Sequence, residues 1–190
     1  MDRQLLPSEP SCVRPRAAPD AYRAAMRRFA GAVCIVATGT PGRRAGMTAT
    51  AVCSVSAEPP RLLVCASTDG SSHEPISRNG RLSINLLRED SDALARRFGG
   101  MPGGASGDAR FAHGRWSMHA GVPLLDDACA AFVCKVERVI PAGTHSIFLC
   151  DVVDVLCPDA DTAGERACLL YVDGGFRGLA PAGRQPSATF

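Results

Sequence analysis

Short apolar runs separated by turn residues are the feature of this 190-residue chain that most restricts its fold. Residues 32–37 form a continuous apolar run, which a loop rich in Gly, Pro and Arg closes at residues 39–46. Further runs of this kind occupy residues 61–66, 82–87, 128–139, 145–156 and 167–172. Runs of this length, bounded by turn signals, predict β-strands. We therefore expect a mainly β protein in which six or seven strands form one closed barrel, with short helices at its edges.

Helical spacing of apolar residues predicts short helices at three places. The first covers residues 21–29, with Asp20 as its N-cap and Tyr22 and Phe29 among the apolar positions that face inward. Two more are expected at about residues 73–79 and 91–98, on either side of the run at 82–87. For the last helix, Ser91 is the expected cap, and its inward positions are Leu94, Ala95 and Phe98.

The two ends of the chain differ from its middle. Residues 1–18 are rich in Pro and are interpreted as a flexible lead, and residues 180–190 as a flexible tail, which leaves one domain at residues 19–179. No apolar run reaches the roughly 18–20 residues needed to span a bilayer, and the first residues lack the apolar core of a secretory signal. We expect a cytoplasmic protein with no membrane partner.

Charge and cysteine usage exclude several classes of function. The formal net charge is only +2, which argues against nucleic acid as a partner. The nine cysteines form no CxxC pair and lie mostly in apolar runs, so we expect reduced thiols in the core rather than disulfide bonds. The four histidines show no metal-ligand spacing, and no metal site is predicted. Of the 21 basic residues, all but Lys135 are arginines.

Two segments could bind a small molecule. Residues 46–56 are interpreted as one strand, in which residues 47–56 are rich in small methyl and hydroxyl side chains. A flat ligand could lie close to its backbone amides; the alternative is an ordinary strand in an Ala-rich protein. Residues 67–72 form a polar turn after a buried strand, whose N–H groups and hydroxyls could hold a phosphate at the start of the next helix. An ordinary loop is the alternative there.

The order and spacing of these segments resemble the short-chain flavin reductases, the NAD(P)H:FMN oxidoreductase components of two-component monooxygenases. Similar members include the reductases of 4-hydroxyphenylacetate 3-monooxygenase and of pyrimidine utilisation. The resemblance covers about residues 20–179 in order. The matching pieces are YRAAM (22–26), AVCIV (32–36), GMTATAVCSVS (46–56), PPRLLVC (59–65), SINLL (83–87), LARRFGG (94–100), RF (110–111), Trp116, GVPLL (121–125), GTHSIF (143–148) and LLY (169–171).

This resemblance implies an FMN-binding split β-barrel of Greek-key type, usually a homodimer with the flavin near the subunit interface. It implies FMN or FAD and NADH or NADPH as cofactors, and a separate flavin-dependent monooxygenase that receives the reduced flavin. It makes His145 the residue that positions the nicotinamide nucleotide; a histidine satisfied within the barrel is the alternative. The other implied flavin-binding residues are Met47, Thr48, Ala49, Thr50, Ala51, Ser54, Ala66, Ser67, Ser71, Ser72, Phe98, Gly99 and Tyr171.

Some positions depart from the family pattern. Relatives often carry Asp where Thr144 stands, Asn where Ser67 stands, and an aromatic hydroxyl where Phe176 stands. These changes affect nucleotide preference and flavin affinity. Phosphate recognition favours arginine, and the candidates near the expected cleft are Arg28, Arg43, Arg44 and Arg110, with solvated surface charge as the alternative.

Two other functions fit the same barrel. One is a non-catalytic carrier or sensor that holds flavin or haem. The other is a flavoenzyme like pyridoxamine-phosphate oxidase, which needs a second phosphate cradle that this sequence does not show. Hydride transfer between two stacked rings needs neither a nucleophile nor paired carboxylates, and the sequence contains no motif for either.

Overall fold

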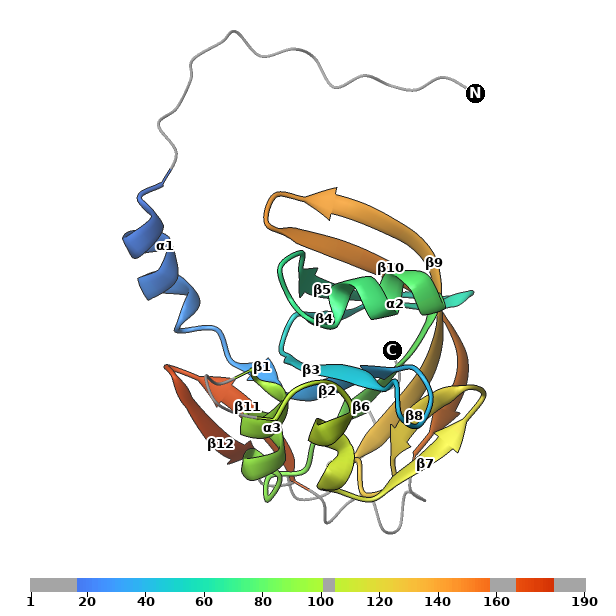
Figure 1. Ribbon diagram of the computed structural model, residues 1–190. Helices are drawn as coiled ribbons and strands as arrows, with labels where there is room; N and C mark the ends of the chain where they lie inside the picture. Colours follow the sequence, from blue (N-terminus) through green and yellow to red (C-terminus); the bar gives the residue numbers. More distant parts are fainter. Residues whose placement is uncertain (1–16, 101–104, 158–166, 180–190) are drawn as a thin grey trace, which may run out of the picture.

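A computed structural model describes residues 17–100, 105–157 and 167–179, and within these residues the main element is one seven-stranded antiparallel sheet (Figure 1). Across the sheet the strand order is β3-β2-β6-β9-β10-β5-β4. In chain order the strands are β2 (Cys34–Thr38), β3 (Ala45–Ala49), β4 (Val52–Ala57), β5 (Pro60–Ser67), β6 (Arg81–Leu86), β9 (Ala130–Ala142) and β10 (His145–Leu156). The mainly β architecture expected from the apolar runs is therefore present.

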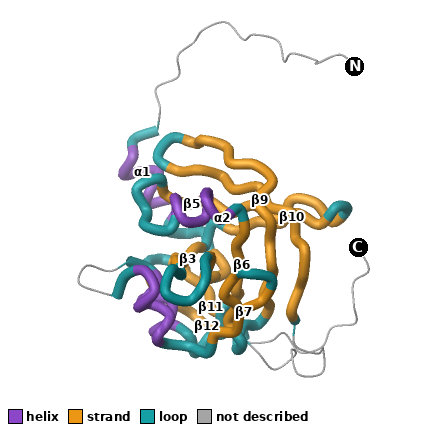
Figure 2. The backbone as a smooth tube through the Cα atoms, turned by 45° about the vertical axis from the view of Figure 1, so that its right-hand side comes forward, coloured by secondary structure: helices purple, strands orange, loops and turns teal. Residues whose placement is uncertain are grey.

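Smaller elements surround this sheet, and Figure 2 shows the helices at the periphery of a body made of strands. Two small sheets are formed by β1 (Gly31–Ala32), β11 (Cys168–Val172) and β12 (Gly175–Leu179), and by β7 (Trp116–His119) and β8 (Val122–Leu125). The helices are α1 (Pro19–Met26), α2 (His73–Asn79), α3 (Asp92–Phe98) and the 3-10 helix η1 (Gly107–Ala112). The β7–β8 hairpin and η1 were not predicted, because their runs are too short to show a period.

The segment predicted as one strand at residues 47–56 is two strands, which is a correction. β3 ends at Ala49 and β4 begins at Val52, and β4 pairs with β5 rather than with β3. Between the two strands, the carbonyl of Ala51 accepts a hydrogen bond from the N–H of Cys65 (3.0 Å). The sheet therefore coils into a barrel whose edge strand β3 approaches β5 without pairing with it along its length.

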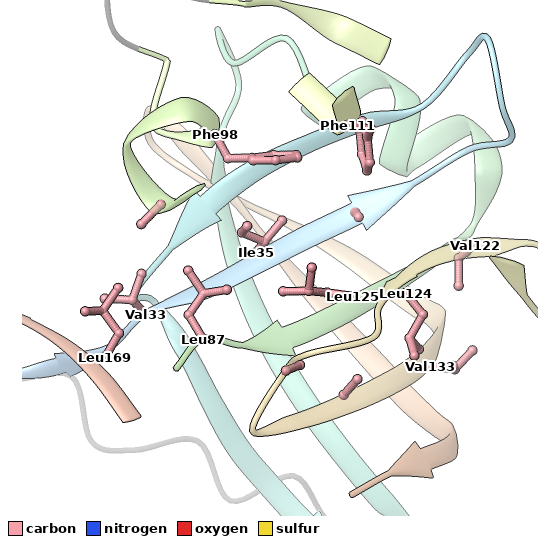
Figure 3. Packing of buried hydrophobic residues seen from close by; sticks show 14 residues of the cluster. Val33, Ile35, Leu87, Phe98, Phe111, Val122, Leu124, Leu125, Val133 and Leu169 are labelled. Atoms are coloured by element: carbon pink, nitrogen blue, oxygen red, sulfur yellow. The ribbon is translucent and has the colours of Figure 1, made fainter. Parts of the chain in front are cut away.

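Strand β2 lies at the centre of the packing because both of its faces are buried. Alternate residues point to opposite faces of a strand, so Ile35 and Ala37 join one core cluster while Val36 joins the other. The second cluster fills the barrel and is closed by Ile76 of α2. Figure 3 shows the first cluster, in which Phe98 lies over Ile35.

A fully buried amide connects the barrel to the β7–β8 hairpin. The Nδ2 of Asn85 donates hydrogen bonds to the carbonyl of Ile35 (3.0 Å) and to Oγ of Ser83 (2.9 Å). Its Oδ1 accepts one from the N–H of Leu125 in β8 (2.9 Å). Because every polar atom of this side chain is satisfied, the amide fixes the hairpin against β6 at little desolvation cost.

Helix α1 is present, but its expected packing is wrong. It begins at Pro19 after an Ala18 cap, so Asp20 lies in the first turn rather than at the N-cap. None of its residues is buried, and Tyr22 is 60% exposed while Phe29, just after the helix, is 69% exposed. Figure 1 shows α1 standing away from the barrel.

Seven cysteines in the described residues are free thiols, as expected: Cys34, Cys53, Cys65, Cys134, Cys150, Cys157 and Cys168. Burial raises the pKa of the Cys34, Cys134 and Cys150 thiols to about 12, so these groups stay protonated at neutral pH. Cys53, expected in the core, is exposed instead, because β4 is an edge strand whose central residues are exposed on both faces. No helix within the described residues is long and apolar enough to cross a membrane.

Asp108 of η1 holds the loop between β2 and β3. Its Oδ1 accepts hydrogen bonds from the backbone N–H groups of Gly42 (3.0 Å) and Arg44 (3.1 Å) and from Nε of Arg44 (2.7 Å), and its Oδ2 accepts one from Nη2 of Arg44 (3.0 Å). The Arg44 side chain above all lowers the pKa of this carboxyl to about 2. The ionised carboxylate therefore stabilises the fold at neutral pH.

We predict that Asp108→Asn lowers stability in a pH-dependent way. The folded-state pKa lies below the unfolded one, so the contribution of the carboxylate is complete above about pH 4 and is lost as the pH falls through about 2. Urea unfolding of both proteins between pH 7 and pH 2 should show a difference that is constant near neutrality and disappears in acid. The exposed Asp126→Asn is the control, with no such convergence. An Asp108→Asn deficit that does not change with pH would contradict the assignment.

Candidate functional site

A cavity of about 490 Å³ lies in the split of the barrel, between β3 on one side and the end of β5 on the other. Its volume is in the range that small-molecule and cofactor sites occupy. The residues that line it are Met47, Thr48, Ala49, Thr50, Ala51, Cys65, Ala66, Ser67, Gly70, Ser71, Ser72, Phe98, Gly99, Gly100, Arg110 and His145. Most of these side chains are small, so the wall of the cavity is formed largely by backbone.

The β3 wall presents backbone groups that have no strand partner on the cavity side. β3 is an edge strand and pairs only with β2, in a register that places Thr48 opposite Ile35. The outward-facing carbonyl of Gly46 accepts a hydrogen bond from Nη1 of Arg110 (2.7 Å) rather than from a strand. Since outward groups recur every second residue in an antiparallel strand, the N–H and C=O of Thr48 face the same side. A planar ligand with donors and acceptors along one edge can bind there.

A polar turn after β5 forms the opposite wall. The N–H of Gly70 donates to the carbonyl of Ser67 (3.1 Å), and the N–H of Thr68 donates to the carbonyl of Thr144 (3.0 Å). These bonds tie the turn to itself and to the β9–β10 hairpin. Ser72 is buried while Ser71 is exposed, and both line the cavity.

The C-terminal end of α3 and the end of η1 form the third wall. Phe98 is fixed by edge-to-face packing on Phe111, with ring centroids 5.0 Å apart, and by Trp116 at 5.6 Å. The hydroxyl of Thr48 donates to the carbonyl of Ala95 (2.6 Å), which joins β3 to α3. Aromatic packing thus makes this wall rigid, and Gly99 and Gly100 bring backbone to the cavity surface.

His145 lies at the rim, as the first residue of β10 and opposite Ser67 in the strand register. Its side chain is exposed, and its Nδ1 is 2.9 Å from the hydroxyl oxygen of Thr144. A second histidine, His73, is different: its Nε2 is 2.9 Å from Oγ of Ser146, and its ring packs on Phe148. His145 is therefore available to a ligand, while His73 has a packing role.

The structure brings nearly all of the predicted site residues to this one cavity. Ser54 is the exception on β4: it is exposed and does not line the cavity, because the chain breaks before β4 and turns the strand away. Tyr171 lines a neighbouring cavity of about 310 Å³ with Phe176, and this cavity shares Thr48, Thr50 and Gly99 with the main one. Whether the residues bind a flavin stays a prediction.

Some lining residues were missing from the predicted set. Cys65 and Gly70 lie between predicted positions, and only the course of the chain places them at the cavity surface. Among the candidate arginines, only Arg110 lines the main cavity. Arg43 and Arg44 line a separate groove, and Arg28 is exposed. No cluster of three or more potential metal ligands occurs within the described residues.

Comparisons with known proteins converge on one family. Residues 26–180 match the model of a family described as flavin reductase like domain. The FMN reductase (NADH) RutF of Variovorax paradoxus is 40% identical over 177 residues, which cover 93% of this chain and 92% of that protein.

Solved structures agree with the sequence comparison. BorF, the flavin reductase component of a bacterial two-component tryptophan halogenase, is 30% identical with a TM-score of 0.76, covering 86% of this chain and 99% of that chain. The NADH:FAD oxidoreductase of Streptomyces globisporus, solved with NAD and FAD fragments, is 26% identical with a TM-score of 0.76, covering 88% and 98% of the two chains. The predicted split-barrel fold is thereby confirmed.

Proposed function

The chain belongs to the flavin reductase-like domain family, and from this premise we propose that it is an NADH-dependent FMN reductase that supplies reduced flavin to a separate monooxygenase. The observation that carries the proposal is the cavity in the barrel split, where the unpaired edge of β3 faces the polar turn after β5. FAD and NADPH, the predicted alternatives to FMN and NADH, can be tested in the activity assay described below.

The residues of the cavity fit a flavin. The backbone N–H and C=O of Thr48 can meet the polar edge of the isoalloxazine ring, and the small side chains of Ala49 and Ala51 leave room for its flat face. The hydroxyls of Ser71 and Ser72 suit the ribityl chain and the phosphate. When bound, a flavin supplies a ring that accepts a hydride from a reduced nicotinamide.

The protein's own contribution is orientation and electrostatics. The rigid wall formed by Phe98 and its aromatic neighbours fixes one side of the cavity, so a ligand held against it has little freedom. The N–H groups of the β3 edge are preorganised donors for negative charge that develops on a bound ring. His145 at the open rim is placed to contact a second ligand that enters from solvent.

A homodimer is the assembly that we propose. The apolar residues around α1 (Tyr22, Met26 and Phe29) are 40–69% exposed, and Tyr171 beside the second cavity is 41% exposed. An isolated eight-residue helix is marginally stable in water, so α1 needs a surface to pack on. A second copy of this chain would supply that surface and would cover the cavity that Tyr171 lines.

The first prediction from this proposed function concerns activity. Purified protein with NADH and FMN should oxidise NADH continuously, with the rate followed by the loss of nicotinamide absorbance. FAD, riboflavin and NADPH in the same assay define the substrate range. Binding of flavin without any oxidation of NADH or NADPH would contradict the reductase and favour a flavin carrier.

A second prediction assigns His145 to the nucleotide. His145→Ala should raise KM for NADH about tenfold, with a smaller change in kcat and in the affinity for FMN, because the side chain contributes binding rather than proton transfer. The exposed His113, outside the cavity, is the matched control as His113→Ala. Unchanged KM for NADH in His145→Ala would remove this role.

A third prediction concerns assembly. Light scattering during size-exclusion chromatography should give the mass of a dimer for the wild-type protein. Phe29→Glu should raise the dimer dissociation constant at least tenfold, because it buries a charge in an apolar contact. Arg28→Glu changes charge at the neighbouring exposed position and should have a much smaller effect. A monomeric wild-type protein at all concentrations would contradict the assembly.

A further inference from the structure

We propose that Arg110 recognises the phosphate of the bound flavin and makes this protein prefer FMN over riboflavin. The proposal rests on the proposed function of the cavity and adds a specificity-determining residue to it. The evidence comes from the burial, the partners and the position of one guanidinium group.

Arg110 is a buried cation with free donors at the cavity. The residue is only 7% exposed, and its Nε and Nη1 donate to the carbonyls of Ala105 (3.0 Å) and Gly46 (2.7 Å), with Phe98 at 3.5 Å. Its Nη2 has no hydrogen-bond partner among the described residues. In the same residues, every fully buried side-chain nitrogen or oxygen has a partner. The Nη2 group is therefore accessible, and it lies beside Gly100 at the cavity surface.

No carboxylate neutralises Arg110 in the described part of the chain. The neighbouring acid, Asp108, is held by Arg44 through its side chain and backbone. A buried charge satisfied only by carbonyl dipoles is costly, and a bound anion offsets that cost. The planar fork of a guanidinium matches the oxygens of a phosphate in particular.

The position of Arg110 favours the phosphate over the ring as its target. The connection from β3 to β4 is hydrogen-bonded to β5 at Ala51 and Cys65, both of which line the cavity. Arg110 donates to the carbonyl of Gly46, which lies toward the other end of β3 from this hydrogen bond. Ser71 also lies at this end, because it lines a neighbouring groove together with Ala45. A guanidinium and a serine turn thus lie at one end of the cavity, and the flat ring fits beside the small side chains of Ala49 and Ala51 at the other end.

The test compares the affinities of FMN and riboflavin, which differ only in the phosphate. Flavin fluorescence titration gives both dissociation constants without any need for turnover. In Arg110→Met the affinity for FMN should fall about 10- to 100-fold, the loss typical of a charge-assisted hydrogen bond, while that for riboflavin falls far less. Arg110→Lys keeps the charge and should recover part of the preference for FMN.

Arg97→Met is the matched control. Arg97 donates to the carbonyls of Arg110 (2.9 Å) and Ala109 (2.6 Å), so it anchors the same 3-10 segment, but it does not line the cavity. Its loss should lower the melting temperature and leave the FMN-to-riboflavin ratio as in the wild type. The ratio therefore separates phosphate recognition from a structural role.

The remaining outcomes are decisive as well. Equal losses for both flavins in Arg110→Met would overturn the proposal and leave Arg110 as a structural residue. An unchanged ratio with a lowered midpoint potential of the bound flavin would overturn it in favour of contact with the reduced ring. If the wild type binds FMN more tightly than riboflavin but does not oxidise NADH, the reductase fails and the role of Arg110 is retained.

Discussion

The break between β3 and β4 is the constraint on which the site depends. If the chain had formed a hairpin at Thr50 and Ala51, β3 and β4 would have paired, and both edges of the sheet would have been closed. Instead β4 pairs with β5, and β3 keeps an edge whose backbone groups face open space. Unpaired edges are normally a liability because they invite pairing with another strand. Here the edge is partly covered by side chains from outside the sheet, namely the guanidinium of Arg110 and the residues around Phe98.

These covering elements are held by the packing on the far side of β2. Phe98 and Phe111 belong to the same cluster as Ile35, and Figure 3 shows the two rings on one side of that cluster. The buried amide of Asn85 connects β6 to the β7–β8 hairpin, which closes the opposite side of the cluster. One core therefore supports both β3 and the wall that faces the cavity. The polar turn after β5 belongs to the other half of the barrel, so the cavity lies between two separately packed units.

The sequence predicted the strands better than it predicted their connections. The run at residues 145–156 is long and mostly apolar, and in the structure it forms strand β10 with the predicted bounds. The break at Thr50 was not visible, because its flanks have the same Thr, Ser and Ala composition as the strand itself. Cys53, expected in the core, and Ser54, which the family resemblance implies at the flavin, are both exposed on β4. The prediction for helix α1 was wrong for a different reason. Its apolar spacing predicts the helix correctly, but spacing does not show whether the surface that the helix packs on belongs to the same chain.

The partners of the arginines are the feature that the sequence could least predict. In the sequence, Arg44 and Arg110 are two of the four arginines expected near the cleft, and nothing distinguishes one from the other. In the fold Arg110 belongs to η1 and Arg44 contacts η1 through Asp108, which neutralises it. Among the described residues, carbonyls alone accept hydrogen bonds from Arg110. The second arrangement leaves positive charge directed into the cavity. The same guanidinium also joins η1 to β3 through the carbonyl of Gly46. An anion bound to it would therefore stabilise the contact between η1 and the unpaired edge of β3. By mass action, ligand binding at this point would stabilise the part of the barrel that lacks strand pairing.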